Sequence, residues 1–256
     1  MQTESWGRNL IGRTAVIAGD AYTVGRATAS LFLREGARVI WVDDKPGQQG
    51  KNQISIDGTD IPYIHADLTD AAQVKQAALT CGRIVPAVHI LFNCAGRADK
   101  QSFEDTTEDT WSEMIGRNLT STFLCSKYFL PLMKQAGGGS IIHQGSIDSM
   151  LGNPSIAAYS AAKGGIVPLT HVMAHDLSSY GIRVNTIATG GIRAPGEARP
   201  VDQARMSVTP SQRMGTPEDV ARVALFLASD LSAYVNGANI VVDGGRTGVT
   251  QGCYEG

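Results

Sequence analysis

The stretch from Arg13 to Asp43, RTAVIAGDAYTVGRATASLFLREGARVIWVD, decides the fold. It begins with a short apolar run, passes through a loop that contains Gly19 and Gly25, and continues as a helical pattern that Gly36 ends. A second apolar run follows at once and ends in Asp43. Both runs are apolar throughout rather than alternating, which is typical of parallel strands that helices cover on both faces. The stretch therefore predicts a strand–helix–strand unit of a parallel sheet.

The rest of the chain continues this alternation of short apolar runs and longer helical patterns. We expect further strands at residues 61–66, 87–92, 140–143, 182–188 and 238–242. We expect helices at residues 25–35, 70–81, 107–135, 156–180 and 218–228. No linker or internal repeat separates these elements. The expected fold is therefore α/β: one domain over residues 1–256, a Rossmann-type doubly wound parallel sheet of about seven strands with helices on both faces.

Composition and charge argue against several classes of protein. The 256 residues are 43% hydrophobic and 18% charged, which is too apolar for an intrinsically disordered chain. A net charge of −2 argues against nucleic acid as a partner. No apolar run reaches the roughly 18 residues of a membrane-spanning helix, and the N-terminus lacks the apolar core of a signal peptide. The cysteines are far apart, so we expect no metal site and a reducing, cytoplasmic location.

The loop from Gly19 to Gly25 lies between the first expected strand and helix. Glycines at this turn let backbone N–H groups approach a pyrophosphate, which the helix N-terminus also favours electrostatically. Asp43 ends the second strand, where an acid accepts hydrogen bonds from the adenosine ribose hydroxyls and repels a 2′-phosphate. Together they predict an NAD site, with Asp44 adding to the repulsion. An ordinary strand–helix turn, and an Asp favoured by the turn after a strand, remain alternatives.

Tyr159 and Lys163 are four residues apart in an expected helix, so both side chains lie on one face. An ammonium beside a phenol lowers the phenol pKa, which makes Tyr159 a usable general acid or base near neutral pH. Ser146 lies just past an expected strand, at the end of the sheet where doubly wound folds bind ligands, and can donate to a substrate oxygen. By itself a Tyr–Lys pair at this spacing is modest evidence, because composition alone produces it often.

In their order and spacing these motifs resemble those of the classical short-chain dehydrogenase/reductase family, from about Gly12 to Gly245. Residues 93–96 are similar to the family's Asn-Asn-Ala-Gly segment, and residues 213–218 and 242–245 to its C-terminal signatures. The catalytic set that the resemblance implies is Asn118, Ser146, Tyr159 and Lys163. The cofactor-binding residues that it implies are Gly19, Tyr22, Thr23, Val24, Gly25, Asp43, Asp67, Leu68, Asn93, Ala95, Gly96, Tyr159, Lys163, Gly190 and Ile192.

The chain departs from the family pattern in two places. Ala18 stands where the glycine loop usually opens with Thr, and Thr23 stands where it usually has Gly. Because Thr23 carries a Cβ, it must avoid positive φ or accept strain, and its hydroxyl could contact a phosphate. Thr189 replaces a usual Pro, and Ala194 a usual Thr, near the expected nicotinamide position. These changes bear on cofactor affinity rather than on the fold.

The resemblance implies hydride transfer between a substrate carbon and nicotinamide C4, with Tyr159 transferring the proton. Ser146 would hold the substrate oxygen, Lys163 the nicotinamide ribose and Asn118 a water of the proton relay. We expect an NAD-dependent dehydrogenase of a secondary alcohol on a small polyhydroxylated or anionic molecule, such as a sugar or cyclic diol. A ketone or 3-oxoacyl reductase of the same family, and a catalytically idle NAD-binding scaffold, remain alternatives.

Two further expectations concern the substrate and the assembly. By the family's pattern, the positions that contact substrate are Arg97, Asp148, Asn153 and Arg193. Asp148 suits a hydroxyl-bearing substrate, or else caps its own loop. Arg97 and Arg193 could hold a carboxylate, sulfonate or phosphate, or lie solvated on loops. The long helices 107–135 and 156–180 carry apolar residues on more than one face, so we expect a homotetramer.

Overall fold

The computed structural model describes residues 8–20, 23–44, 50–194, 196 and 203–249. In this part of the chain, eight strands form one sheet in the order β3-β4-β2-β1-β5-β6-β7-β8. The strands are β1 (Thr14–Ala18), β2 (Arg38–Asp43), β3 (Gln53–Ile56), β4 (Thr59–His65), β5 (Ile90–Asn93), β6 (Gly139–Ser146), β7 (Ile182–Thr189) and β8 (Asn239–Val242). The α-helices are α1 (Val24–Arg34), α2 (Ala71–Ile84), α3 (Glu108–Ile115), α4 (Ser121–Gln135), α5 (Ala157–Asp176), α6 (Gln203–Ser207) and α7 (Pro217–Ala228).

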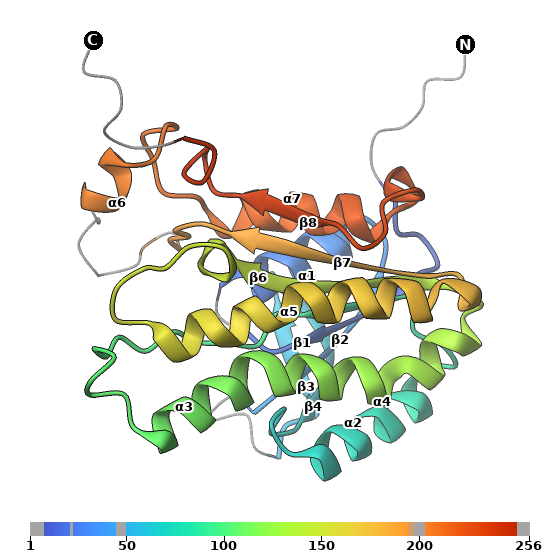
Figure 1. Cartoon of the computed structure of the whole chain (residues 1–256). Coiled ribbons are helices and arrows are strands. Elements are labelled where there is room, and N and C mark those ends of the chain that lie inside the picture. Colours follow the sequence, from blue (N-terminus) through green and yellow to red (C-terminus); the bar gives the residue numbers. More distant parts are fainter. Residues whose placement is uncertain (1–7, 21–22, 45–49, 195, 197–202, 250–256) are drawn as a thin grey trace, which may run out of the picture.

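Helices cover both faces of this sheet (Figure 1). α2, α4 and α5 lie on one face, whereas α1 and α7 lie on the other. All neighbouring strands are parallel except β3 and β4, so the expected doubly wound α/β fold is confirmed. The strand order reverses between β1 and β5, and the chain leaves these two strands toward opposite faces. Doubly wound folds bind ligands at such a switch point, beyond the carboxyl ends of the strands.

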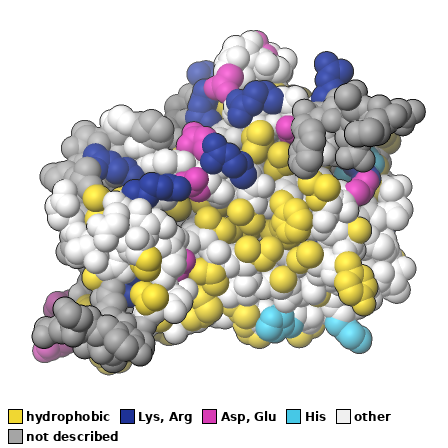
Figure 2. Space-filling view, turned by 90° about the horizontal axis from the view of Figure 1, so that it is seen from above, with side chains coloured by type: hydrophobic (Ala, Val, Ile, Leu, Met, Phe, Trp, Pro, Cys, Tyr) yellow, Lys and Arg dark blue, Asp and Glu magenta, His cyan; other side chains and the backbone are white. Residues whose placement is uncertain are grey.

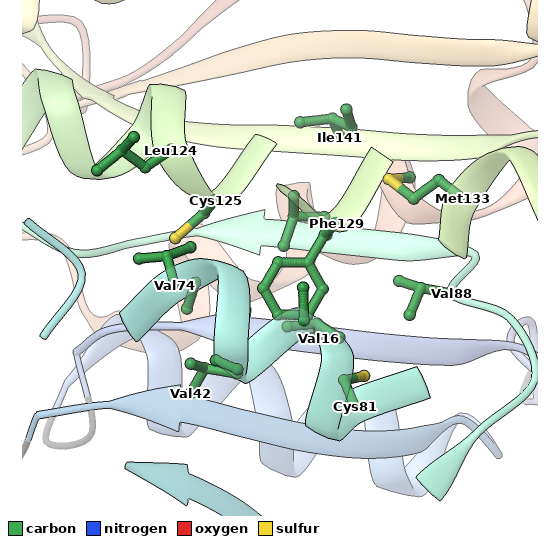
Figure 3. Close-up of a cluster of buried hydrophobic side chains, with 14 of the residues drawn as sticks. Val16, Val42, Val74, Cys81, Val88, Leu124, Cys125, Phe129, Met133 and Ile141 are labelled. Atoms are coloured by element: carbon green, nitrogen blue, oxygen red, sulfur yellow. The ribbon is translucent and has the colours of Figure 1, made fainter. Parts of the chain in front are cut away.

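Each face of the sheet has its own apolar core. Phe129 of α4 is fully buried and lies beside Val16 of β1, within a cluster that includes Cys81 of α2 (Figure 3). Phe32 of α1 and Leu227 of α7 are fully buried in the core on the opposite face. Burial of a side chain of this size contributes roughly 2 kcal/mol, so the two cores fix the sheet between its helix layers.

Strand β3 was not among the expected strands, so the sheet of the described residues has eight strands rather than about seven. β3 and β4 form an antiparallel hairpin whose turn residues, Asp57 and Gly58, have φ values of +50° and +82°. Asp-Gly is favoured in type I′ hairpin turns because both residues tolerate positive φ. Ile54 and Ile56 are buried and alternate with exposed residues, so this signal was present in the sequence.

The two long expected helices are interrupted or shortened. A π-helical segment, Gly116–Thr120, joins α3 to α4. α5 ends at Asp176, and a short 3₁₀ turn, Ser178–Tyr180, follows. Within the described residues, no helix has the length and apolar character needed to cross a membrane.

Candidate active site

α5 places Tyr159 and Lys163 one turn apart on the side of the helix that faces β6. Lys163 is 3% exposed, and its Nζ atom lies 5.8 Å from the centroid of the Tyr159 ring. Nζ donates a hydrogen bond of 2.8 Å to the carbonyl oxygen of Gln144 on β6. The structure therefore brings the two side chains of the Tyr–Lys motif together and anchors the ammonium at the carboxyl end of the sheet.

Burial lowers the pKa of Lys163 from 10.5 to about 8, because the charged ammonium loses its hydration. The Cys94 sulfur and the Asp20 carboxylate act in the opposite direction and favour the protonated form. Burial also lowers the pKa of His143, to about 3, so this neighbour on β6 is neutral near pH 7. Lys163 thus carries its charge beside the phenol at neutral pH while remaining close to its own titration.

Asn118 lies in the π-helical segment between α3 and α4 and is fully buried. Its Nδ2 atom donates to the carbonyl oxygens of Met114 and Arg97, at 3.0 and 2.9 Å, and its Oδ1 accepts from Arg97 N at 3.1 Å. A methyl group on Gly96 would clash with Asn118 Oδ1 and lie 3.1 Å from Lys163 Nζ. Asn118 and Lys163 therefore converge on this glycine. The widened turn, a feature common at functional sites, has no signal in the hydrophobic pattern.

Ser146 is the last residue of β6 and is 4% exposed. Its hydroxyl lies 3.1 Å from Asp148 Oδ2, and Asp148 N donates back to Ser146 Oγ at 3.1 Å. The second Asp148 oxygen accepts a hydrogen bond from Asn153 Nδ2. Ser146 thus forms one polar group with the two predicted substrate residues, Asp148 and Asn153.

The glycine loop after β1 approaches the loop after β5 closely. A methyl group on Gly19 would lie 2.6 Å from Ala95 N, so only glycine fits there. Thr23 adopts φ −126°, which avoids the strain that its Cβ would cause at positive φ. Its hydroxyl donates to the Asp20 carboxylate at 2.6–2.8 Å, so in this structure it is not directed at a phosphate. Tyr22 lies outside the described residues.

Asp43 ends β2 and is 9% exposed, at the position that an acid would need to meet a ribose. Tyr63 donates to its backbone oxygen at 2.7 Å, which fixes the strand end. Asp67 follows β4, and its carboxylate accepts from Thr69 N and Oγ1. Leu68 beside it is buried. Both strand ends therefore lie on the switch-point edge of the sheet.

The segment after β5 is held by buried polar groups. Asn93 Nδ2 donates to Ser126 Oγ at 3.0 Å and lies 3.1 Å from His143 Nδ1, which ties β5 to α4 and β6. Cys94 Sγ donates to the carbonyl oxygens of Ala18 and Gly19, at 3.4 and 3.2 Å. Cys94 is a free, buried cysteine, which is typical of a cysteine that packs as a small hydrophobe.

A cavity of about 700 Å³ opens beside Ser146 and Asp148, between the loops that follow β6, β7 and β8. Gly190 and Ile192 line it, and Gly190 packs so closely on Asp243 that a Cβ would lie 2.8 Å from Asp243 Cα. Asp148 and Asn153 also line it, whereas Arg97 and Arg193 are not among its lining residues. The Arg97 guanidinium instead pairs with Asp99 at 2.5 Å.

Three basic residues of the cavity wall were not predicted: Lys100, Arg213 and Arg246. Arg213 donates to Asp219 at 2.7 Å. Lys100 and Arg246 have no ion-pair partner among the described residues. Arg213 belongs to a segment that resembles a family signature, but its place in the cavity wall, like that of Lys100 and Arg246, depends on loops that only the fold brings together. No group of three His, Cys, Asp or Glu side chains that could hold a metal gathers in the described ranges.

The described residues fit a nicotinamide dinucleotide. Among them, the N–H of Val24 at the start of α1 has no hydrogen-bond partner, and such a donor suits a pyrophosphate. Gly96 leaves space beside Asn118 and Lys163 that a Cβ would fill. A carboxylate, that of Asp43, ends β2, and such a group can accept hydrogen bonds from ribose hydroxyls. These groups lie on one edge of the sheet, from β2 across β1 to β5 and β6.

Comparison with known proteins gives concordant results. A family model described as enoyl-(acyl carrier protein) reductase matches residues 19–247. The chain is 37% identical to 2-(S)-hydroxypropyl-CoM dehydrogenase 3 of Xanthobacter autotrophicus, over 91% of this chain and 96% of that protein. It is 34% identical to an NADP-dependent (R)-specific alcohol dehydrogenase of Lentilactobacillus kefiri, over 93% of this chain and 98% of that protein. A solved short-chain dehydrogenase/reductase from Burkholderia xenovorans superposes with a TM-score of 0.85 at 31% identity, covering 96% of this chain and 100% of that one.

The fold, the Tyr–Lys pair and these relatives define an oxidoreductase that acts on CH–OH groups with a nicotinamide cofactor, NAD or NADP. The chain belongs to the short-chain dehydrogenase/reductase family.

Proposed function

We propose that the protein is an NAD-dependent dehydrogenase that oxidises a secondary alcohol on a small polar substrate. The observation that carries the proposal is that Tyr159, Lys163 and Asn118 lie together near the carboxyl ends of β5 and β6. Ser146 ends β6 and is hydrogen-bonded to Asp148, which lines a cavity of about 700 Å³. Each residue type that the reaction needs is present, and Lys163 and Asn118 are held by hydrogen bonds that they donate to backbone carbonyl oxygens.

In the proposed mechanism the chain's own residues handle the proton. When bound, nicotinamide supplies the acceptor for the hydride that leaves the substrate carbon. Tyr159, as a phenolate, removes the hydroxyl proton as the carbonyl forms. The Lys163 ammonium stabilises the phenolate, and Ser146 holds the reacting oxygen. Asn118 holds a water through which the Tyr159 proton reaches solvent.

The choice of NAD over NADP is supported by Asp43. Asp43 is buried at the end of β2, and in the proposed binding mode its carboxylate would repel a 2′-phosphate on the adenosine ribose. Asp44 follows directly, and its N–H donates to Asp43 Oδ1 at 2.9 Å, which holds that carboxylate in place. The NADP-dependent relative shows that both cofactors occur among similar proteins, so the choice needs a direct test.

The cavity wall supports a polyhydroxylated or anionic substrate. Asp148 and Asn153 offer hydrogen bonds to a hydroxyl next to the one that reacts at Ser146. Lys100 and Arg246 add positive charge that the described residues leave unpaired, and such groups bind a carboxylate, sulfonate or phosphate. Arg97 and Arg193 stay weaker candidates, since neither lines the cavity.

The decisive experiment measures NADH formation from NAD with a panel of sugars, cyclic diols and hydroxy acids, with Tyr159→Phe as the control. Turnover on a hydroxylated or anionic member, absent in the control, supports the proposal. If the protein only reduces ketones or 3-oxoacyl thioesters, the reductase alternative holds. If it binds NAD but converts no substrate in either direction, the alternative of an idle scaffold holds.

We further propose that the protein assembles as a homotetramer. Phe123 of α4 and Val172 of α5 are 44% and 58% exposed on neighbouring helices. Hydrophobic side chains also gather on the face that carries the edge strand β8 (Figure 2), where Val241 is 40% exposed. One interface would pair the α4 and α5 surfaces of two subunits, and the other would pair the faces that carry the edge strand β8. Two such two-fold interfaces give a tetramer. Light scattering should give about four times 27.1 kDa, and a stable species of 27.1 kDa would contradict it.

A further inference from the structure

Asp20 places a carboxylate inside the glycine loop. Its Oδ1 accepts hydrogen bonds from Thr23 N at 3.1 Å and Thr23 Oγ1 at 2.8 Å. Its Oδ2 accepts from Gly25 N at 3.1 Å and also lies 2.6 Å from Thr23 Oγ1. Both oxygens therefore bind donors of the turn that leads into α1.

These donors belong to the region that a dinucleotide needs. In a doubly wound fold the cofactor pyrophosphate lies against the backbone N–H groups at the start of the first helix. Here the carboxylate already engages the N–H of Gly25, whereas the N–H of Val24 has no partner among the described residues. Within the part of the loop that the structure describes, a pyrophosphate at the start of α1 would meet the N–H of Val24 as a donor without a partner and, beside it, a fixed negative charge.

The backbone explains how the carboxylate is held there. Asp20 has φ +48°, in the left-handed region that Asp and Asn tolerate better than most other residues. In this conformation the carboxylate accepts hydrogen bonds from the backbone N–H and the hydroxyl of Thr23. The Thr23 hydroxyl, which could have contacted a phosphate, therefore donates its hydrogen bond to the Asp20 carboxylate instead.

The charge of Asp20 also acts on other groups of the site. Burial raises the pKa of the Cys94 thiol well above its ordinary value, and the carboxylates of Asp20 and Asp43 raise it further. Asp20 likewise favours the protonated form of Lys163. The carboxylate is therefore within electrostatic reach of Cys94 in the segment after β5 and of Lys163 at the catalytic end of the site.

We propose that Asp20 is a built-in competitor for the pyrophosphate, which weakens the hold on the dinucleotide and speeds its release. The inference rests on the proposed function only in requiring a nicotinamide dinucleotide, and it holds for NAD and NADP alike. Release of the reduced cofactor limits turnover in many dehydrogenases, so a weaker hold on the pyrophosphate would serve turnover.

The test compares Asp20→Asn with the wild-type protein by calorimetric titration with ADP and with adenosine. Asn keeps the shape and tolerates the same φ, and its one amide oxygen can still accept from Thr23. The variant therefore removes the charge and frees the N–H of Gly25, which only the second Asp20 oxygen accepts from. ADP should bind about tenfold more tightly, the size expected for removing one nearby like charge at a protein surface, and adenosine should bind unchanged. Stopped-flow displacement should show NADH leaving about tenfold more slowly.

Thr23→Val is the matched control, because it removes the hydroxyl that holds the acid but leaves the charge. It should not tighten ADP binding. Unchanged or weaker ADP binding by Asp20→Asn would overturn the proposal, and so would equal tightening by both variants, which would assign the effect to loop geometry. NADH and NADPH should gain the same factor in Asp20→Asn, so an error in the NAD assignment would leave this result standing.

Discussion

At the carboxyl ends of β5 and β6 the chain keeps all four residue types of the family's catalytic set, whereas the loop after β1 departs from the family pattern at Ala18 and Thr23. The residues proposed to be catalytic contribute side-chain groups: a phenol, an ammonium, a hydroxyl and an amide. The loop contributes mainly backbone N–H groups, and at Gly19 it approaches Ala95 closely. Thr23 is tolerated because its φ is −126° and Asp20 binds its hydroxyl. A site that depends on side-chain chemistry requires particular residues. A site that depends on backbone N–H groups tolerates substitutions, provided that the backbone conformation is kept.

Of the changes considered, removal of the Tyr159 hydroxyl should reduce activity most. Tyr159→Phe should lower the catalytic rate about a thousandfold, since positioned proton transfer contributes on this scale. The cofactor should still bind nearly as well, because Asp43 and the glycine loop are untouched. Steady-state kinetics and NADH titration measure the two effects.

Tyr180→Phe is the matched control for that variant. Tyr180 lies in the 3₁₀ turn beyond α5, where its ring contacts Lys134 Nζ at 3.6 Å. Its loss should leave turnover unchanged. Near-normal turnover by Tyr159→Phe would sink the proposed mechanism.

Lys163→Met should expose what the buried ammonium costs in stability. The folded pKa is about 8 and the ordinary value is 10.5, so the folded state binds fewer protons than the unfolded state between these two values. The free energy of unfolding should therefore rise with pH across this window, and below pH 8 the full penalty applies. Met carries no charge, so Lys163→Met should be more stable at pH 7, by at most about 3 kcal/mol, and should lose this pH dependence.

Urea unfolding of both proteins between pH 7 and pH 10.5 measures this difference. Lys75→Met, on the exposed side of α2, is the control and should not alter the slope. The same Lys163→Met variant should lose both turnover and cofactor affinity. An unstable variant with a wild-type slope would mean that Lys163 is not the buried cation that the structure indicates.

The sequence was sufficient for the parallel sheet, which depends on local patterns, whereas the catalytic set was implied by the family resemblance and stays a prediction. Continuous apolar runs predicted every strand of the parallel part, and the Tyr159–Lys163 spacing placed two side chains on one face of α5. The π-helical turn at Asn118 could not be predicted, since it changes hydrogen bonding without changing hydrophobic period. Lys100 and Arg246 are far apart in sequence and share a wall only in the fold.

Asp43→Ala should have the smallest of these effects. It tests which residue sets the preference between NAD and NADP. The wild-type protein should prefer NAD over NADP by at least about tenfold in kcat/KM, because charge-assisted hydrogen bonds to the ribose contribute roughly 1.5–3 kcal/mol. Asp43→Ala removes these bonds and the repulsion of a 2′-phosphate, so NAD efficiency should fall and the gap to NADP should narrow. Asp44→Ala is the matched control, because it removes a neighbouring charge that does not end β2. Asp44→Ala should narrow the difference in kcat/KM between NAD and NADP less than Asp43→Ala does. If the wild-type protein prefers NADP, or if Asp43→Ala leaves the ratio unchanged, then Asp43 does not accept the ribose hydroxyls, and the adenosine end must lie against other residues.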